Sequence, residues 1–220
     1  ISTIPIDRAA RAVGEMMQVF RAGLSMGQLA TFGLPGEKIG GFTVPDGNIA
    51  VGTVCSVTIN GIFLSEGIAT CSRFGGLLEI DQGRPTRFTQ IIHYDGTTLD
   101  PLEIFIKGHM TRVREASSGG KGVIGASFRE IPAPALPAVT KLDRRLQKIG
   151  LGAVLLVGKP NQPVLDIPVQ NGRVGIVVIG GLNPIAAVEE AGIETKNMAM
   201  AVLHDFENLV PCSDMLKIKF

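Results

Sequence analysis

The chain alternates between amphipathic segments with helical spacing and short apolar runs of strand length. Two apolar stripes recur every three or four residues, and they consist of Ala9, Val13, Met16, Met17 and Phe20 and of Val139, Leu142, Leu146 and Ile149. The first stripe predicts a helix from Asp7, as a capping residue, to Arg21, with Gly23 ending it. The second predicts a similar helix that ends at Gly150.

The remaining segments combine strands with a few short helices. Strands are expected at Leu29–Phe32, after Gly47, at Gly76–Ile80, Arg87–Tyr94 and Gly122–Ile131, and after Gly152 and Gly172. Thr111–Ser118 is typical of a short polar helix, and Pro132, Pro134 and Pro137 predict a stiff linker. Leu102–Ile106 fits a strand, although Asp100-Pro101 equally favours a helix start, and Met198–Leu203 fits either state. The many hairpins and the lack of regular βαβ alternation favour an α+β fold with mixed or antiparallel sheets and flanking helices.

The strongest regularity is an internal repeat without gaps at a spacing of 125 residues. Gly33 corresponds to Gly158, and the same spacing relates Pro35, Val44, Gly47, Gly67, Ile68, Thr70 and Leu78 to Pro160, Val169, Gly172, Gly192, Ile193, Thr195 and Leu203. The glycines and prolines are informative because each restricts the backbone to particular turns and helix ends. The sequence therefore predicts two pseudo-repeated halves, residues 6–69 and 138–205, separated by a long β-rich insert, residues 71–137, attached to the first half.

Each repeat has a simple physical interpretation. A hairpin turn at Gly47 or Gly172 leads into a long apolar strand, and the strand ends at Asn60 or Asn183. Either asparagine can cap the short helix that follows, which stops at Gly67 or Gly192. A strand that leads into a helix N-terminus is a potential anion site, although most helix N-termini bind only water or their own cap.

Composition narrows the functional classes. The 220 residues carry a net charge of +1, which gives no basic footprint for nucleic acid, and the 45% hydrophobic content favours a homo-oligomer, at least a dimer. Three cysteines without metal or redox spacing indicate a reduced, intracellular and mostly buried set, consistent with a cytoplasmic protein. No membrane-spanning segment is predicted. The first residue, Ile1, suggests that the chain is part of a longer protein.

No catalytic, nucleotide-binding or metal-binding motif is evident, and no cofactor is expected. What stands out instead is a set of polar residues and glycines within apolar segments: Thr58, Asn60, Ser72, Arg73, Gly75, Gly76, Thr97, Thr98, Ser127, Arg129 and Asn183. An arginine flanked by apolar residues and glycine is a candidate fork for a carboxylate. The alternative for Arg73 and Arg129 is an ion pair with a structural acid such as Glu79 or Glu130.

Three long segments of the insert resemble one family. SRFGGLLE at Ser72–Glu79, YDGTTLDPLEIF at Tyr94–Phe105 and GASFREIP at Gly125–Pro132 are similar to the effector domain of NrpR, the archaeal repressor of nitrogen-assimilation genes. GKPNQP at Gly158–Pro163 and GGLNPIA at Gly180–Ala186 extend the resemblance over nearly the whole chain.

The resemblance implies a non-enzymatic, effector-binding transcriptional regulator. Members of this family carry an N-terminal winged-helix domain that binds DNA, which this chain lacks, and they repress as oligomers. They release the operator when 2-oxoglutarate accumulates. The resemblance supplies no residue-level map, so the candidate ligand site, formed by Arg73 or Arg129 with the Thr97–Thr98 loop and the Asn60 helix start, rests on residue chemistry.

Two other functional classes remain open at the level of sequence. One is an enzyme acting on a small keto or dicarboxylic acid with His93 or His204 as the base, although no nucleophile–base–orienter set can be named. The other is a dimerisation module that binds no ligand.

Overall fold

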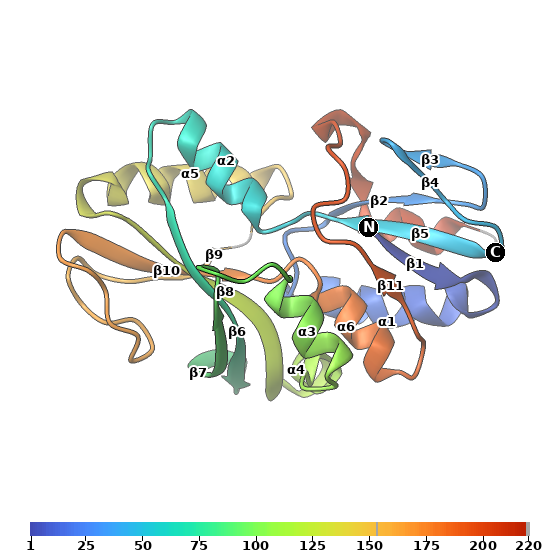
Figure 1. The fold of residues 1–220 in the computed structure, drawn as a ribbon, viewed down its shortest axis with the longest axis horizontal. Helices are drawn as coiled ribbons and strands as arrows, with labels where there is room; N and C mark the ends of the chain where they lie inside the picture. Colours follow the sequence, from blue (N-terminus) through green and yellow to red (C-terminus); the bar gives the residue numbers. More distant parts are fainter. Residues whose placement is uncertain (153, 219–220) are drawn as a thin grey trace.

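The computed structural model describes residues 1–152 and 154–218, which form two lobes side by side, each around a five-stranded sheet (Figure 1). The first sheet has the order β11 (Lys196–Asn197), β1 (Ser2–Pro5), β5 (Asn48–Thr53), β2 (Leu29–Gly33) and β12 (Val210–Pro211). The second has the order β7 (Arg84–His93), β6 (Cys71–Asp81), β8 (Gly122–Pro132), β10 (Arg173–Ile179) and β9 (Val154–Val157). Neighbouring strands are antiparallel throughout both sheets, and a small hairpin, β3 (Lys38–Ile39) with β4 (Phe42–Thr43), flanks the first.

The predicted α+β class with two pseudo-repeated halves is confirmed by the strand order. The first half runs β1, α1 (Ala9–Arg21), β2, β5 and α2 (Val57–Ser65), and the second runs β8, α5 (Leu136–Lys148), β9, β10 and α6 (Asn183–Glu190). The middle strands follow the same order, β1-β5-β2 in one sheet and β8-β10-β9 in the other. The repeat thus begins one strand earlier than predicted, and Ile4-Pro5 of β1 corresponds to Ile131-Pro132 of β8.

Two of the repeated glycine pairs have backbone angles that other residues rarely adopt. Gly47 and Gly172 have φ of 73° and 76° in the hairpin turns, and Gly67 and Gly192 have φ of 73° and 77° just after α2 and α6. A side chain is strained at such angles, whereas glycine adopts them freely. This requirement explains why the glycines stand in register in the sequence.

The two halves exchange their second helices. Helix α2 leaves the first half and packs with α5 over the second sheet, where Ile59 and Phe63 are buried against Val139 and Ile176 (Figure 1). Helix α6 leaves the second half and packs against α1 of the first, while its Ala186 and Ala187 contact the core of the second sheet. Burial of a side chain such as Phe63 contributes about 1.5–3 kcal/mol. Each lobe is therefore completed by the other half of the chain.

The two connections that carry this exchange touch where they cross. Residues 54–56 lead from β5 into α2, and residues 180–182 lead from β10 into α6. A Cβ atom at Gly181 would overlap the carbonyl oxygen of Val54, so only glycine permits this approach.

Asn183 fixes the second connection through its side chain. It is 1% exposed, and its Oδ1 accepts the N–H of Gly125 at 2.8 Å. Its Nδ2 donates to the carbonyl oxygens of Gly125 at 2.9 Å and Leu24 at 3.1 Å. The prediction that Asn183 caps α6 is wrong, because its amide bonds β8 and Leu24 in the segment after α1, and Leu182 holds the cap position.

The insert extends the second lobe rather than the first. Its strands β6 and β7 pair with each other, β6 pairs with β8, and β8 is itself the opening strand of the second repeat. The prediction that the insert is attached to the first half is therefore wrong. Local propensity could not reveal this, because strand partners are chosen by long-range pairing.

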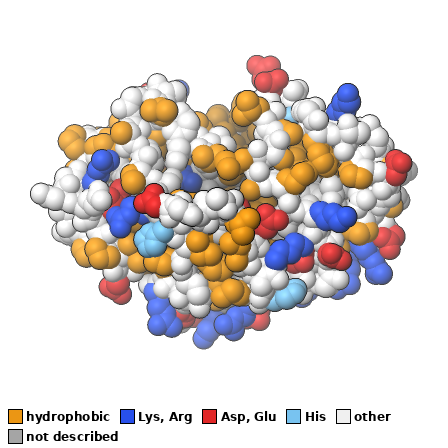
Figure 2. All heavy atoms as spheres, in the orientation of Figure 1, with side chains coloured by type: hydrophobic (Ala, Val, Ile, Leu, Met, Phe, Trp, Pro, Cys, Tyr) orange, Lys and Arg blue, Asp and Glu red, His pale blue; other side chains and the backbone are white. Residues whose placement is uncertain are grey.

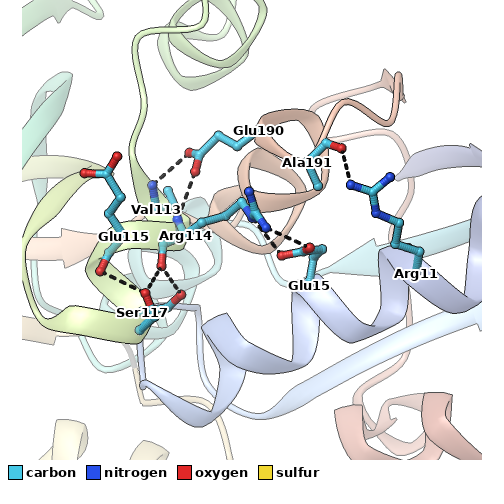
Figure 3. A network of polar contacts seen from close by, with 9 residues as sticks. Arg11, Glu15, Val113, Arg114, Glu115, Ser117, Glu190 and Ala191 are labelled. Atoms are coloured by element: carbon cyan, nitrogen blue, oxygen red, sulfur yellow. Dashed lines mark hydrogen bonds and ion pairs between the residues drawn. The ribbon is translucent and has the colours of Figure 1, made fainter.

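Helices α3 (Pro101–Lys107) and α4 (Val113–Gly119) complete the insert. Asp100 caps α3 by accepting the N–H groups of Leu102 and Glu103, which settles the ambiguous segment as a helix. The N-terminus of α4 is capped from outside, because Glu190 of α6 accepts the N–H groups of Val113 and Arg114 (Figure 3).

A charged pair links the same helix to the first lobe. The guanidinium of Arg114 on α4 bonds both oxygens of Glu15 on α1, at 2.9 and 3.1 Å, as Figure 3 shows. Together with the Glu190 cap, it joins the insert to α1 and to the exchanged helix α6.

Several expected boundaries differ from the structure. Helix α2 begins at Val57, three residues before Asn60, so Asn60 is not its cap. Pro137 lies in the first turn of α5, and residues 133–135 form a 3-10 helix (Ala133–Ala135) rather than a linker. Residues 198–203 are irregular, and two further 3-10 helices, Phe206–Asn208 and Cys212–Lys217, follow. Of the cysteines only Cys212 is buried, whereas Cys55 is partly exposed and Cys71 exposed.

Because of this crossing, we expect alanine substitutions at Gly181 and Gly14 to change the free energy of unfolding in opposite directions. Gly181→Ala should lower the free energy of unfolding by about 2–3 kcal/mol, because the new methyl group must displace the Val54 backbone. Gly14→Ala is the matched control on the exposed face of α1, where a Cβ meets nothing within 4 Å, and it should stabilise by about 0.5–1 kcal/mol. Urea unfolding of both variants measures the difference; equal effects would contradict the tight crossing.

The Asn183 bonds predict a pH-dependent loss of stability in Asn183→Asp. A carboxylate there would face the Leu24 and Gly125 carbonyl oxygens, at a cost of about 3 kcal/mol near neutral pH. Burial raises the folded-state pKa of such a carboxyl above its unfolded value, so the loss should shrink as the pH falls toward the unfolded pKa of about 4. Urea unfolding at pH 7 and 5 tests this, with Asn48→Asp at a partly exposed position as the control. A loss that does not change with pH would argue against a buried carboxylate.

Candidate functional site

The most unusual side chain in the protein is Arg129, which is 2% exposed in the centre of the second sheet. Its Nη1 donates to the Ser56 carbonyl oxygen at 2.6 Å, and its Nη2 donates to Ser56 Oγ at 2.9 Å. Its Nε has no partner, and within residues 1–152 and 154–218 no carboxylate forms an ion pair with it. A buried, uncompensated guanidinium is costly, so it indicates a place prepared for an anion.

The strand pattern of β8 explains how Arg129 reaches this position. Side chains alternate between the faces of a strand, so Ser127 and Arg129 point to the same face as Ile131, which α2 and α5 cover. On the neighbouring strand β6, Ser72 lies opposite Arg129 and Gly75 lies opposite Ser127. The site is thus a polar strip on a sheet face that is otherwise apolar.

The phenol of Tyr94 lies beside this strip. A Cβ at Gly75 would come within 3.2 Å of the Tyr94 hydroxyl and within 2.9 Å of the Pro101 ring, so Gly75 makes room for both. Burial raises the pKa of Tyr94, while Arg129 and a hydrogen bond with Ser127 act in the opposite direction. The phenol therefore stays protonated and can donate a hydrogen bond.

Arg129, Tyr94 and Cys55 lie close enough together to shift one another's pKa. Burial lowers the pKa of the Arg129 guanidinium, and nearby Tyr94 and Cys55 oppose that change. Burial also raises the pKa of the Cys55 thiol, so it remains protonated near neutral pH. Of these three groups only the guanidinium is charged at neutral pH, and the Asp100 carboxylate, which helps to raise the pKa of both Tyr94 and Cys55, lies within electrostatic range of them.

Asn60 offers a further unsatisfied polar atom. Its Nδ2 donates to Ser72 Oγ at 2.8 Å, and its buried Oδ1 has no partner. Asn60 lies one helical turn after Ser56 on α2, and Ser72 is the strand neighbour of Arg129. The amide and hydroxyl therefore border the guanidinium on the side of α2.

A cavity of about 730 Å³ opens next to this cluster, between α2 and the C-terminal segment. Cys55 and Thr58, which flank Ser56 in sequence, are among its lining residues, together with His204 and exposed Met200 and Leu203. Figure 2 shows this face hollowed between the lobes, with apolar side chains around the hollow. The cavity supplies a route from solvent to the start of α2.

The predicted site residues divide into two groups. The structure brings together Arg129, Ser127, Ser72, Gly75, Asn60 and Thr58 around the start of α2. The other five lie apart from this cluster or are committed elsewhere: Arg73, Gly76, Thr97, Thr98 and Asn183.

Arg73 forms an ion pair with a structural acid, which is the alternative interpretation given for it from the sequence. Its Nη1 bonds Glu130, whose side chain is fully buried on the opposite face of β8 from Arg129. The guanidinium of Arg73 is thereby neutralised.

The remaining residues have local structural roles. Thr97 accepts the N–H of Leu99 within its own loop, and Thr98 is exposed beside it. Neither hydroxyl bonds Arg129 or Asn60 within the described residues, and the convergence of this loop with Asn60 stays a prediction. Gly76 gives space to the Gln90 carbonyl and the Phe88 ring of β7. The amide of Asn183 is fully occupied, as described above.

Sequence reasoning missed Ser56, Tyr94 and Cys55. Ser56 precedes the apolar start of α2, which is a recognisable cap position, but its hydroxyl bonds Arg129 instead of the helix. Tyr94 is the single tyrosine of the chain and sits in one of the quoted segments, a signal that could have singled it out.

The described part of the chain offers few other functional features. No group of three or more His, Cys, Asp or Glu is placed to hold a metal ion there. The helices that the structure describes include none long and apolar enough to cross a membrane. His93 lies exposed on β7, and His204 lines the cavity.

Comparison with known proteins places the chain in a family. It matches the NrpR regulatory domains NRD1 and 2 over residues 1–211. It is 36% identical over 167 residues to the global nitrogen regulator NrpRI of Methanosarcina mazei, covering 76% of this chain and 52% of that protein. It is 30% identical over 163 residues to the global nitrogen regulator NrpR of Methanococcus maripaludis, covering 74% of this chain and 28% of that protein.

A solved structure agrees with these matches. The crystal structure of a nitrogen repressor-like protein from Methanococcus jannaschii superposes with a TM-score of 0.74 at 27% identity, covering 96% of this chain and 86% of that one. The chain spans about half the length of the Methanosarcina relative and less than a third of the Methanococcus maripaludis one. On the match over residues 1–211 and these relatives, the chain belongs to the family of NrpR regulatory domains.

Proposed function

We propose that the chain is the effector-sensing part of a transcriptional repressor of nitrogen-assimilation genes and that it binds 2-oxoglutarate, which relieves repression. The observation that carries the ligand assignment is the buried, uncompensated Arg129. Family membership supports the regulatory role, because the relatives are named as global nitrogen regulators. DNA binding is assigned to a winged-helix domain outside this chain.

The chemistry of the cluster suits a small dicarboxylate. One carboxylate of 2-oxoglutarate binds the guanidinium of Arg129, since charge-assisted bonds to a bidentate fork are about twice as strong as neutral ones. The start of α2, a helix of nine residues, adds the favourable end of its dipole next to the same point. The protonated hydroxyls of Tyr94, Ser127 and Ser72 are donors for the remaining oxygens, and no catalytic base is required.

The duplication leaves one such site in each chain. The strand registers make Ser2 the counterpart of Arg129, because Ser2 lies opposite Val51 and Arg129 lies opposite Ile176, which are repeat equivalents. The 125-residue spacing makes Gly181 the counterpart of Ser56. The second junction therefore lacks both the cation and the serine, and we assign it a structural role.

An enzymatic function is the second candidate, because His204 lines the cavity that leads to the cluster. Its buried Nε2 has no partner among the described residues, so no orienting group holds it as a general base. Incubation with 2-oxoglutarate followed by product analysis distinguishes binding from turnover.

Two Arg→Met variants separate binding from folding. Arg129→Met should stay within about 1 kcal/mol of the parent in unfolding free energy, because it removes a buried charge without a carboxylate partner. Its affinity for 2-oxoglutarate should fall about 30- to 100-fold, since charged hydrogen bonds are lost. Calorimetry, which should give one ligand per parent chain, measures the effect. Unchanged affinity would show that Arg129 does not hold the ligand.

Arg73→Met is the matched control. It leaves the fully buried Glu130 unpaired and should cost about 2–3 kcal/mol of stability, less than a fully buried pair because the Arg73 side chain is 27% exposed. Folded Arg73→Met should bind 2-oxoglutarate like the parent. Loss of binding in this variant alone would move the site to the other face of β8.

We also propose that the chain self-associates, as a homodimer at least. Large apolar side chains are exposed, including Leu203 at 98%, Met200 at 72% and Leu64 at 70%. Contact between copies would remove this surface from water. Sedimentation equilibrium at micromolar concentration should give a mass well above the 23.2 kDa of one chain, and a clean monomer would contradict the proposal.

A further inference from the structure

Ser56 uses only part of the hydrogen-bonding capacity of Arg129. A guanidinium carries one N–H on Nε and two on each terminal nitrogen. The carbonyl oxygen of Ser56 accepts one N–H from Nη1 at 2.6 Å, and its hydroxyl oxygen accepts one from Nη2 at 2.9 Å. Nε is buried and has no partner among the described residues. The Nε–H and the second N–H of each terminal nitrogen therefore remain available to a ligand.

The free donors include a complete edge of the guanidinium. The two acceptors belong to one residue and lie close together, so they occupy the end of the fork, between the two terminal nitrogens. The Nε–H and the outer N–H of the adjacent terminal nitrogen form a second edge, with two parallel donors in one plane. A carboxylate matches such an edge with its two oxygens. The Nε edge of Arg129 can thus receive a carboxylate while Ser56 keeps the end.

The orientation of the Ser56 side chain shows which group it serves. Serine at the cap position of a helix usually accepts a backbone N–H of the first turn. Ser56 holds the cap position of α2 without any such bond, and its hydroxyl oxygen is turned to Arg129 instead. Removal of the hydroxyl therefore costs α2 no capping bond.

The same face of α2 holds a second polar residue of the cluster. Asn60 lies four residues after Ser56, so both side chains project from one side of the helix. The Asn60 amide donates to Ser72 Oγ at 2.8 Å, and Ser72 is the strand neighbour of Arg129. Two successive turns of α2 thus hold two adjacent polar side chains of the sheet. Since α2 comes from the first half of the chain and β8 from the second, this arrangement depends on the exchange of helices.

We propose that the ligand carboxylate binds the Nε edge of Arg129 and that Ser56 is a positioning residue that holds the guanidinium for it. This inference rests on the proposed binding of 2-oxoglutarate and identifies how that site is oriented. Ser56 fixes the plane of the fork from its end, so the free edge keeps its direction before and after the ligand arrives. A donor pair that is already ordered loses little freedom on binding, and this raises the affinity.

Nuclear magnetic resonance of the isotope-labelled 220-residue chain observes the proposed edge directly. The Nε–H signal of Arg129 is assigned by its absence from the spectrum of Arg129→Met. When 2-oxoglutarate is added to the parent, this signal should move downfield and its exchange with water should slow, because a carboxylate oxygen then accepts the Nε–H.

Ser56→Ala tests the positioning role. It removes the hydroxyl acceptor and keeps the backbone one, so it should bind 2-oxoglutarate roughly three- to tenfold more weakly than the parent in calorimetry. The N–H that it frees lies at the end of the fork and gives nothing to a ligand on the Nε edge. In the free variant the Arg129 Nε–H signal should already be shifted or broadened, because one of the two bonds that restrain the guanidinium is gone.

Ser65→Ala is the matched control on the same helix. Its hydroxyl bonds the Ile62 carbonyl oxygen within α2 and does not touch Arg129. Its affinity for 2-oxoglutarate and its Arg129 Nε–H signal should both match those of the parent.

Three results would overturn the proposal in distinguishable ways. An Nε–H signal that does not respond to 2-oxoglutarate, while calorimetry shows binding by the parent, refutes the assignment of the Nε edge. Equal or tighter binding by Ser56→Ala refutes the positioning role of Ser56. Absence of binding by the parent refutes the proposed effector function together with this inference.

Discussion

The contact between Val54 and Gly181 is the constraint on which the rest of the fold depends. Each half sends its second helix toward the other lobe, and the two connections pass each other with no space for a side chain at position 181. The exchange makes the lobes mutually dependent, because α2 completes the core of the second sheet and α6 packs on α1. Asn183 holds the crossing in place by bonding both β8 and Leu24, in the segment after α1. Neither half can be expected to keep its core without the other.

The same crossing brings a buried charge to the start of α2. Arg129 and Arg73 lie on neighbouring strands of the second sheet, yet their side-chain partners differ. Arg73 is paired with a buried carboxylate, an arrangement that serves structure, whereas Arg129 has only the oxygens of a serine. Desolvation of an uncompensated guanidinium is unfavourable, and such local conflicts concentrate where a protein must bind something. The pattern favours an anion site at Arg129 and a structural pair at Arg73.

The two repeated halves share one scaffold, but their junctions differ. The insert adds β6 and β7 to the second sheet only, and with them Ser72, Gly75 and Tyr94 arrive beside Arg129. The first sheet has no such addition and carries Ser2 at the matching place. An asymmetric pair of lobes joined by exchanged helices is suited to convert one local binding event into a change between lobes. Interfaces of this kind have discrete packing arrangements rather than continuous ones.

The sequence by itself determined the repeat, the α+β class, most of the strands and both long helices, because glycine positions and apolar periodicity are local signals. The resemblance of its long segments also identified the family. Only the tertiary structure decided that the insert joins the second lobe, that α2 and α6 exchange places, and that Asn60 and Asn183 cap nothing. The tertiary structure alone distinguished the environment of Arg129 from that of Arg73, and it alone added Ser56 and Tyr94 to the cluster. Pairing between distant strands and the partner of a buried charge depend on contacts far apart in sequence, and local residue patterns carry no record of them.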